Sequence, residues 1–543
     1  MGHRAGHRRW PLPSTAVPST PQSPPDERDA SLNGKGEHPE DLAIGTSGGT
    51  PVGIAPWALM WRRRLAAKVE QSPNQPWIVL WTALFGLFAV QFTITILAVS
   101  IAGIADDFGT EESTVDWVLT GPLLGFAVTG PAAGKLADRY GHRRVYLFGL
   151  TAAMVFNGLS GLAWSAGSLI TFRVMGALLG AATGPSSMAM INQLFAPAER
   201  ARAMGMWSLV MAGGPVFGVV AGGPIVEQFG WRWIFFGQVP LILAGLLIAY
   251  AVLPESTAEP RNEPIDLTGI LLLAAGTLAG MLALNQAPSA GWSSPLILLG
   301  FALTPVLIGA FVVWERRTDH PLLPLPYFSR RNFVFPVMGQ FFTMFAYMGG
   351  FYLTPFMLDK VFGYNEARIG LLTISRPLAF AVTGPIAGYL AVKIGERTSA
   401  VFGTLTIAAS MFALAAVSGG GSADAIVLVA LALSGVGLGA VAPVMSSTVA
   451  NAVDDRDLGI AGAAQQMMSQ IGIVVGITVL LAVQRSNLEG SGVVEGDPGY
   501  TDALSASFTL AYSVGGAVCF LAVVCAAFLK NTKDDRTLVD AAA

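Results

Sequence analysis

Apolar residues come in long blocks along this chain, and short polar stretches rich in Gly, Pro or charge separate them. A helix needs roughly 20 apolar residues to cross the ~30 Å hydrocarbon core of a bilayer. Blocks of that kind predict fourteen membrane-spanning helices, the second being the shortest, at residues 77–101, 117–134, 145–166, 168–192, 204–226, 233–252, 266–285, 295–314, 333–357, 366–392, 398–418, 425–450, 460–483 and 506–529.

The composition agrees with this pattern. Hydrophobic residues make up 53% of the 543 positions, charged residues only 12%, and the mean hydropathy is +0.57, which is outside the range of soluble globular chains. The net charge of −3 argues against nucleic acid as a partner, and no metal-binding or phosphate-binding spacing occurs. Cys519 and Cys525 lie in one apolar block and are expected to be packing residues. We expect an all-α integral membrane protein without a cofactor.

The basic residues predict the orientation. The first 75 residues are rich in Pro, Ser, Gly and charge and are expected to form a disordered cytoplasmic tail, with a start at Met60 as an alternative. With the N-terminus inside, the inner segments hold 26 of the 32 Lys and Arg residues. One span more or fewer would invert every later loop and remove this asymmetry. Four basic residues are expected outside: Arg232, Lys360, Arg368 and Arg485.

One stretch is written twice. "FAVTGPAAGKLADRYG" at 126–141 and "FAVTGPIAGYLAVKIG" at 380–395 agree at eleven of sixteen positions, and eight predicted helices separate them. An even offset gives both copies the same orientation, as in a parallel repeat. We therefore expect two six-helix bundles, at residues 76–253 and 333–530. A two-helix insert at residues 254–332 lies between them, and a second cytoplasmic tail follows at residues 531–543.

Three stretches carry a family resemblance. "GKLADRYGHRR" at 134–144 matches the loop between helices two and three of the major facilitator superfamily, while "WRWIFFGQVP" at 231–240 and "WERRTDHPLLPL" at 314–325 resemble its fourteen-helix drug:proton antiporter branch. The resemblance implies a monomeric transporter of the plasma membrane. It would export drugs or hydrophobic small molecules by alternating access, and it would not be an enzyme.

The 134–144 loop is expected to act as a latch at the cytoplasmic end. A glycine lets two helices approach closely, and a carboxylate at a helix end suits the N-terminus of another helix. In the family, such contacts stabilise the outward-facing state. The alternative is that the basic residues only set orientation. The expected latch residues are Gly134, Asp138, Arg139, Gly141, Arg143 and Arg144, and Val392 replaces Asp138 in the second copy.

Span five reads "GGPVFGVVAGGPI" at 213–225 and resembles the antiporter motif of helix five, which is associated in exporters with sealing the cavity. It departs from that motif because Val219 stands where proline is usual. Generic packing of small residues is the alternative. The residues concerned are Gly214, Pro215, Gly218, Gly222 and Gly223.

Arg376 lies about ten residues into span ten, or about 15 Å along the helix, so it must face protein or a wet cavity. Its expected role is in substrate binding or gating, and the alternative is that it binds carbonyls freed by Pro377. Arg173 in span four matches an arginine of the family. Gln91, Gln340 and Gln466 are further candidates for substrate contact, with helix–helix bonding as the alternative.

No acidic residue lies in the middle of a predicted span, and Gln91 stands where the branch usually has an aspartate. Protons would then depend on carboxylates near span ends: Asp116, Glu227, Asp359 and Glu366. Two buried arginines without a buried carboxylate favour neutral or anionic amphipathic substrates. Two alternatives stay open: an uptake or exchange carrier for an organic anion without proton coupling, and a non-transporting receptor or scaffold.

Overall fold

The computed structural model describes Arg64 and residues 68–91, 94–254, 264–419, 424–494 and 496–531. Most of the expected N-terminal tail and nearly all of the expected C-terminal tail lie outside these ranges. The chain divides into residues 1–56 and residues 57–543, and the second unit contains every helix described below.

The first half of that unit and the insert are helical throughout, because their apolar blocks are broken only by short turns. The first half contains α2 (Gln75–Gln91), α3 (Ile94–Phe108), α4 (Glu112–Val115), α5 (Trp117–Tyr140), α6 (His142–Gly161), α7 (Ala166–Gly180), α8 (Thr183–Leu194), α9 (Arg200–Phe229) and α10 (Arg232–Val252). The insert contains α11 (Leu267–Ala290), α12 (Pro295–Glu315) and the short 3-10 helix η1 (Leu325–Ser329).

The second half repeats the helical pattern, and the described residues contain no strand. Its elements are α13 (Arg331–Lys360), α14 (Glu366–Thr373), α15 (Ser375–Ile394), α16 (Glu396–Ser418), α17 (Asp424–Asn451), η2 (Asp455–Asp457), α18 (Leu458–Gly490) and α19 (Tyr500–Ala527).

Helices occupy all fourteen expected stretches, and ten of the helical segments among the described residues are long and apolar enough to cross a membrane. The segment Ala166–Leu194 combines α7 and α8, and Arg368–Ile394 takes in most of α14 and all of α15. The all-α membrane class is confirmed, while the exact number of fourteen crossings stays a prediction. Span two, expected to end at residue 134, continues as α5 to Tyr140 and carries the charged loop motif on its last turns.

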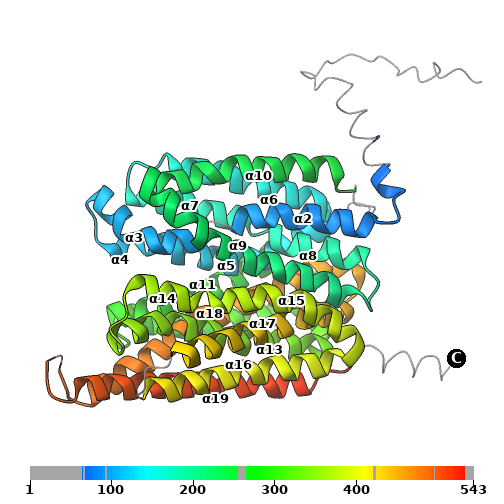
Figure 1. The fold of residues 1–543 in the computed structure, drawn as a ribbon. Helices are drawn as coiled ribbons and strands as arrows, with labels where there is room; N and C mark the ends of the chain where they lie inside the picture. Colours follow the sequence, from blue (N-terminus) through cyan, green and yellow to red (C-terminus); the bar gives the residue numbers. More distant parts are fainter. Residues whose placement is uncertain are drawn as a thin grey trace, which may run out of the picture. The chain divides into compact units, whose positions relative to one another are not determined.

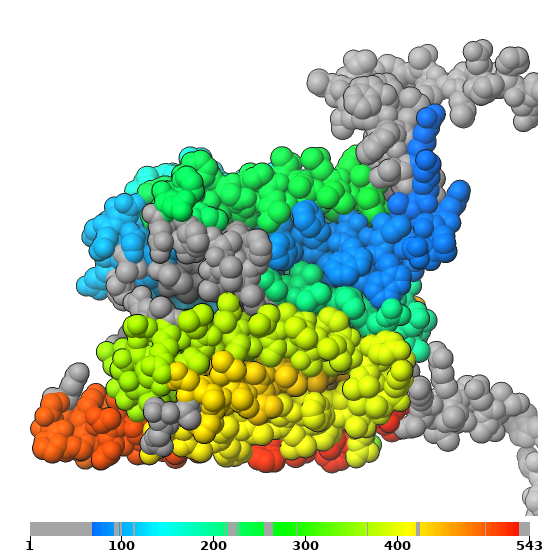
Figure 2. Space-filling model, viewed as in Figure 1, coloured from blue at the N-terminus to red at the C-terminus, as the bar shows by residue number. Residues whose placement is uncertain are grey.

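The two halves form two layers of roughly parallel helices, blue to green and yellow to red in Figure 1. Several helix pairs connect them: α5 packs on α18 and α15 packs on α9, and α17 also contacts α9 while α18 contacts α8. Figure 2 shows part of this boundary, where blue-green atoms of the first half touch yellow-green atoms of the second. The repeated stretches form the ends of α5 and α15, so both copies lie at the boundary between the halves.

The insert packs on one side of this boundary. Met281 of α11 lies in a buried apolar cluster with Leu124 of α5 and Val474 of α18, so α11 contacts both halves. On α12, in contrast, only Ile297, Phe311 and Glu315 are buried. The remaining apolar surface of α12 needs a lipid environment, which agrees with a membrane-spanning chain.

Candidate functional site

Asp138 lies in the last turn of α5 and contacts the start of α18 in the other half. Its Oδ1 and Oδ2 accept hydrogen bonds from the backbone N–H groups of Gly459 and Ile460, both at 2.8 Å. The first N–H groups of a helix have no partner within the helix and carry partial positive charge, so a carboxylate is well suited to them. Asp138 therefore acts as a capping residue supplied by the opposite half. We call this end of the helix bundle the Asp138 end.

Gly134 makes that contact possible. A Cβ atom at this position would lie 2.6 Å from the Cβ of Ala463 and 2.6 Å from the carbonyl oxygen of Gly459. Real Cβ atoms do not approach backbone so closely, and only glycine lets α5 and α18 meet at this distance. The glycine expected to permit close approach is thus placed directly against the helix that Asp138 caps.

Asp138 lies beyond the expected span and is almost completely buried, its side chain being 8% exposed. Burial raises the pKa of its carboxyl to about 7, although the two backbone N–H groups oppose that shift. The Nε2 of His142 lies 3.6 Å from Oδ1, but burial lowers the pKa of this histidine to about 4, so its ring is neutral at pH 7. The helix start, rather than a cation, is therefore the hydrogen-bonding partner of this carboxyl group.

The other loop residues stay within the first half. Gly141 ends α5 with a φ of 93°, a left-handed conformation that favours glycine. Arg143 donates to the carbonyl of Tyr250 at 2.8 Å, and Arg139 lies 5.2 Å from the ring of Tyr140. Arg144 is exposed. Of the six expected latch residues, Asp138 and Gly134 are the two for which the structure gives contacts with the other half.

A second crossing contact closes the α15–α9 boundary. Gly388, the counterpart of Gly134, would place a Cβ 2.5 Å from the carbonyl oxygen of Ala201 on α9. The carboxylate has no counterpart here, because Val392 replaces it. Instead Arg200 of α9, 6% exposed, reaches the second half. Its guanidinium donates to the carbonyl of Ala450 and to side-chain oxygens of Asn451 and Asp455, each at 3.1 Å.

Arg200 was not predicted to be a functional residue, because along the sequence it is only one of many basic residues expected inside. A signal was present: a basic residue opens α9, and the acidic turn with Asp454, Asp455 and Asp457 joins α17 to α18 at the matching place in the second half. Only the three-dimensional pairing of the halves makes these two features partners.

The segment after α12 connects the insert to both halves next to Asp138. Glu315, 4% exposed, accepts the N–H groups of Leu322 at 3.1 Å and Leu323 at 3.4 Å, which fixes the turn. The Nζ of Lys135 donates to the carbonyl of Pro321 at 3.0 Å. The hydroxyl of Tyr327 donates to Oδ2 of Asp457 at 2.6 Å, one residue before α18. We call Arg316–Arg330 the insert exit segment.

Arg376 is 1% exposed and lies near the start of α15. Its guanidinium carbon lies 3.4 Å from the ring centre of Tyr347 and 4.8 Å from that of Phe351, and one Nη donates to the carbonyl of Tyr347 on α13. That carbonyl is not one freed by Pro377, which was the alternative expected. Nε and the other Nη have no partner among the described residues, and no carboxylate pairs with the charge there. Arg376 is thus a buried cation with two donor nitrogens unpaired among the described residues.

The other expected substrate residues are spread out. Arg173 lies 5.7 Å from the ring centre of Phe235, and Gln91 donates to the sulfur of Met211 at 3.6 Å. Gln340 is buried with its Oε1 unpaired among the described atoms, and Gln466 is half-buried. No hydrogen bond among the described residues joins any of these side chains to another or to Arg376. Their roles in substrate contact stay predictions.

The span-five motif lies on α9, which is one continuous helix. A Cβ at Gly214 would lie 3.2 Å from the Cβ of Gln91, so α9 passes close to α2. The side-chain environments of Pro215, Gly218, Gly222 and Gly223 lie outside the described residues. Of the candidate proton carriers, Asp359 forms an exposed ion pair with Lys360 at 3.4 Å, and Asp116 precedes α5. The side chains of Glu227 and Glu366 lie outside the described residues.

Comparison with known proteins gives the same family as the loop motif. The family model described as "Major Facilitator Superfamily" matches residues 83–477 and 337–542. The chain is 31% identical over 420 residues to the tetracenomycin C resistance and export protein of Streptomyces glaucescens, covering 76% of this chain and 77% of the relative. It is 30% identical over 442 residues to the multidrug transporter protein MdtP of Bacillus subtilis, covering 80% of both.

Solved structures support the fold. The human organic anion transporter MFSD10 superposes with a TM-score of 0.59 at 16% identity, over 84% of this chain and all of that one. The proton:xylose symporter XylE gives a TM-score of 0.59 at 16% identity, over 83% of this chain and 94% of that one. The predictions of a transporter fold and of a non-enzymatic protein are confirmed. The chain is a multi-pass membrane protein that belongs to the major facilitator superfamily of transporters.

Proposed function

We propose that the protein exports amphipathic small molecules across the plasma membrane by alternating access, with proton antiport as the driving reaction and a single chain as the transporting unit. The relatives named as a tetracenomycin C resistance and export protein and as a multidrug transporter support the direction and the substrate class. The basic residues of the loops support an orientation with both termini and the Asp138 end in the cytoplasm.

The contact between Asp138 and the start of α18 carries this proposal. Alternating access requires one end of the boundary to be closed by contacts that can break without damage to either half. Asp138 makes two hydrogen bonds to the other half. Next to it, α5 and α18 meet through glycine and alanine residues, so no large side chain interlocks the two helices there. With the Asp138 end in the cytoplasm, this arrangement would be closed to the cytoplasm, as the outward-facing state requires.

Proton coupling draws support from the same carboxyl. In the closed arrangement its pKa is about 7, whereas in water an aspartic acid has a pKa of about 3.9. Opening the Asp138 end would therefore release a proton to the cytoplasm at neutral pH. This release drives export only if the proton reaches the carboxyl from the outer side while the Asp138 end is closed. Among the described residues, no carboxylate lies at the middle of an expected span to do this instead.

Arg376 supports neutral or anionic substrates, because a buried guanidinium without a carboxylate repels cations at short range. The same observation favours a second candidate function, exchange or uptake of an organic anion without proton coupling. In both functions the aromatic rings of Tyr347 and Phe351 would pack against an apolar substrate next to the charge.

Dye flux in proteoliposomes tests these proposals. Purified protein is reconstituted, and the flux of an anionic and a cationic dye of similar size is followed with and without an imposed pH gradient. We expect gradient-driven flux of the anionic dye, its loss in Arg376→Ala, and normal flux in Arg397→Ala, in which an exposed arginine outside the latch is removed. Flux that ignores the gradient would favour the exchange carrier. Equal loss in both variants would remove Arg376 from the substrate site, and no flux of any dye would favour the receptor or scaffold alternative.

A further inference from the structure

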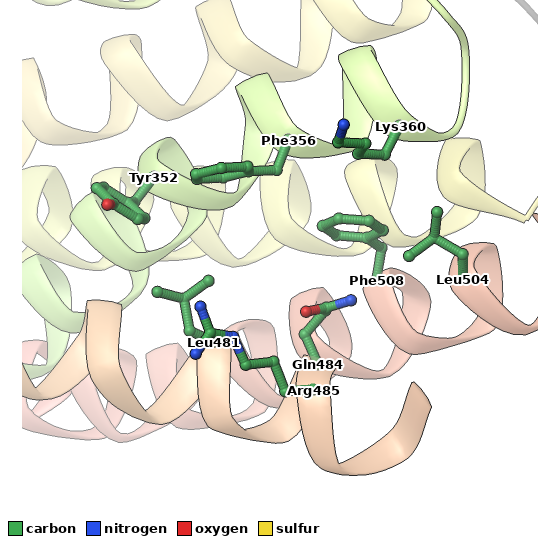
Figure 3. Close-up of a pocket in the computed structure, with 8 residues that line it drawn as sticks. All are labelled: Tyr352, Phe356, Lys360, Leu481, Gln484, Arg485, Leu504 and Phe508. Atoms are coloured by element: carbon green, nitrogen blue, oxygen red, sulfur yellow. The ribbon is translucent and has the colours of Figure 1, made fainter. Parts of the chain in front are cut away.

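A pocket of about 190 Å³ lies at the end of the bundle opposite Asp138, between three helices of the second half. Figure 3 shows residues of α13 on one side of the gap and residues of α18 and α19 on the other. Its lining combines aromatic and aliphatic side chains with two cations: Tyr352, Phe356, Lys360, Leu481, Gln484, Arg485, Leu504 and Phe508.

The cations of the pocket differ from the other basic residues at this end. The guanidinium of Arg232 is held by Asp107 and that of Arg368 by Asp424, in each case a carboxylate from another part of the chain. Lys360 has only its neighbour Asp359, in a pair that is more than half exposed on both sides. Within the described residues, Arg485 forms no ion pair. Two incompletely paired cations thus lie at one pocket.

The interior of the pocket is apolar. Phe508 is 2% exposed and Leu504 6% exposed, so they form a closed floor. Tyr352 and Phe356 pack with ring centres 5.5 Å apart and are each nearly half exposed, so this wall continues onto the lipid-facing surface. Gln484 is fixed by a hydrogen bond from its amide to Ser507 at 3.0 Å. The pocket therefore has an apolar groove with a cationic rim.

The rim lies at the level of lipid headgroups. Arg485 is 27 residues from Leu458 at the Asp138 end, or about 40 Å along α18 at 1.5 Å per residue. Lys360 is 29 residues from the start of α13 at Arg331, or about 43 Å. Both distances exceed the ~30 Å hydrocarbon core, whereas the aromatic wall one to two turns back lies within reach of acyl chains.

We propose that this pocket binds an anionic phospholipid, whose phosphate is attracted by Lys360 and Arg485 and whose acyl chain lies against Tyr352 and Phe356. A free anion would gain no binding energy from the apolar wall, because it has no chain to bury there. A zwitterionic lipid carries a positive charge beside its phosphate, which Lys360 and Arg485 would repel. The match of charge and apolar surface specifies a lipid with net negative charge.

Lipid titration of the purified full chain tests the proposal. Protein stripped of lipid in neutral detergent is titrated with dioleoylphosphatidylglycerol or dioleoylphosphatidylcholine, and native mass spectrometry counts the bound lipids. Each cation near a lipid surface contributes enough that Lys360→Ala with Arg485→Ala should weaken phosphatidylglycerol binding about 30-fold. Binding of phosphatidylcholine should not change, and Lys360→Arg with Arg485→Lys should keep the preference.

The matched control is Arg316→Ala with Arg317→Ala, which removes two exposed charges at the Asp138 end. Equal weakening by this control would show that only overall charge matters and would overturn the pocket as the site. So would unchanged binding in the Lys360/Arg485 double variant. The thermal unfolding midpoint measured without lipid should be the same for both double variants, because all four side chains are exposed or lie on the rim.

Two further arms identify the ligand class. Phe356→Ser leaves both cations in place and should weaken phosphatidylglycerol binding, because the acyl chain loses its wall. Glycerol 3-phosphate carries the headgroup without the chain and should not displace the lipid at millimolar concentration. Displacement by glycerol 3-phosphate would replace the lipid with a soluble phosphate ester, and displacement by the anionic dye alone would make the pocket part of the transport route.

Discussion

At the scale of single residues, closure of the Asp138 end depends on one carboxyl group that changes environment when the halves separate. Asp138 is buried against α18 in the closed arrangement, and Lys135, Asp457 and the neutral ring of His142 are the titratable groups around it. Its pKa is about 7 when closed and would be about 3.9 in water. Closing therefore takes up a proton when the pH lies between about 3.9 and about 7.

The sign of the pH dependence follows from that difference. The proton-linked stabilisation of the closed end is complete below about pH 4 and is lost as the pH rises through about 7. Spin labels at Arg144→Cys and Arg456→Cys, both exposed positions, would report the separation, since both native cysteines are buried. We expect the short distance to lose population from pH 6 to 8. In Asp138→Asn the population should not depend on pH, and a remaining midpoint near 7 would assign the proton to another group.

Gly134 allows a second test on the same scale. Gly134→Ala adds one methyl group where backbone and Cβ atoms lie 2.6 Å away, and overpacking of this kind costs about 1–3 kcal/mol. The ratio of closed to open molecules should fall by roughly five- to 150-fold in the same distance measurement. Gly237→Ala is the matched control, because a Cβ there meets no atom within 4 Å. An unchanged closed population in Gly134→Ala would mean that the helices can shift at no cost.

At the scale of elements, the insert contacts both halves directly at the closed Asp138 end. Leu322 and Leu323 of the insert exit segment pack in a buried cluster with Val449 of α17 and Leu458 of α18. The hydroxyl of Tyr327 then reaches Asp457 immediately before α18. On the first-half side, Lys135 donates a hydrogen bond to the carbonyl of Pro321 in this segment. The insert exit segment is therefore expected to move with the second half and to break the Lys135 contact on opening.

Tyr327→Phe tests that connection. The substitution removes the donor to Asp457, which is 7% exposed, and a hydrogen bond to a charged group contributes about 1.5–3 kcal/mol. Amide hydrogen exchange at Leu322 and Leu323, whose N–H groups bond to Glu315, should become faster. Tyr364→Phe removes a similar tyrosine–aspartate bond at the opposite end and should leave these amides unchanged. Equal protection of these amides from exchange in the native chain and in Tyr327→Phe would show that the insert is not coupled to the turn before α18.

The sequence predicts a feature well when residues close together in the chain determine it, and poorly when the feature depends on contacts between distant residues. Apolar blocks are local, so the helices and the membrane class follow from them directly, and the repeat predicts that Gly134 and Gly388 occupy equivalent places. The partner of Asp138 is the start of a helix more than 300 residues away, which no local pattern specifies. Arg200 was missed for the same reason. Arg376 was expected to be buried because a charge in a span must avoid lipid, but its stacking on Tyr347 depends on how α13 and α15 pack.

At the scale of the whole molecule, the two boundaries have the same shape and different chemistry. Small residues allow close approach in both, but a carboxylate of the first half crosses at α5–α18 and a guanidinium of the first half crosses near α15–α9. If each half moves as a rigid body, both contacts must form and break together. Weakening one boundary should then open the other, although the two contacts share no side chain.

Arg200→Gln distinguishes rigid-body opening from local fraying. The variant removes hydrogen bonds to Ala450 and Asp455 and does not alter Asp138, so a rigid pair of halves should open at both boundaries to the same extent. One label pair, Arg144→Cys with Arg456→Cys, reports α5–α18, and a second pair, Arg202→Cys with Lys393→Cys, reports α9–α15. Arg232→Gln, which breaks an ion pair at the opposite end, is the control and should not lower the closed population of either pair. Opening confined to the second pair would show that the boundaries act separately, and closure of this end would then be two local events rather than one movement of the halves.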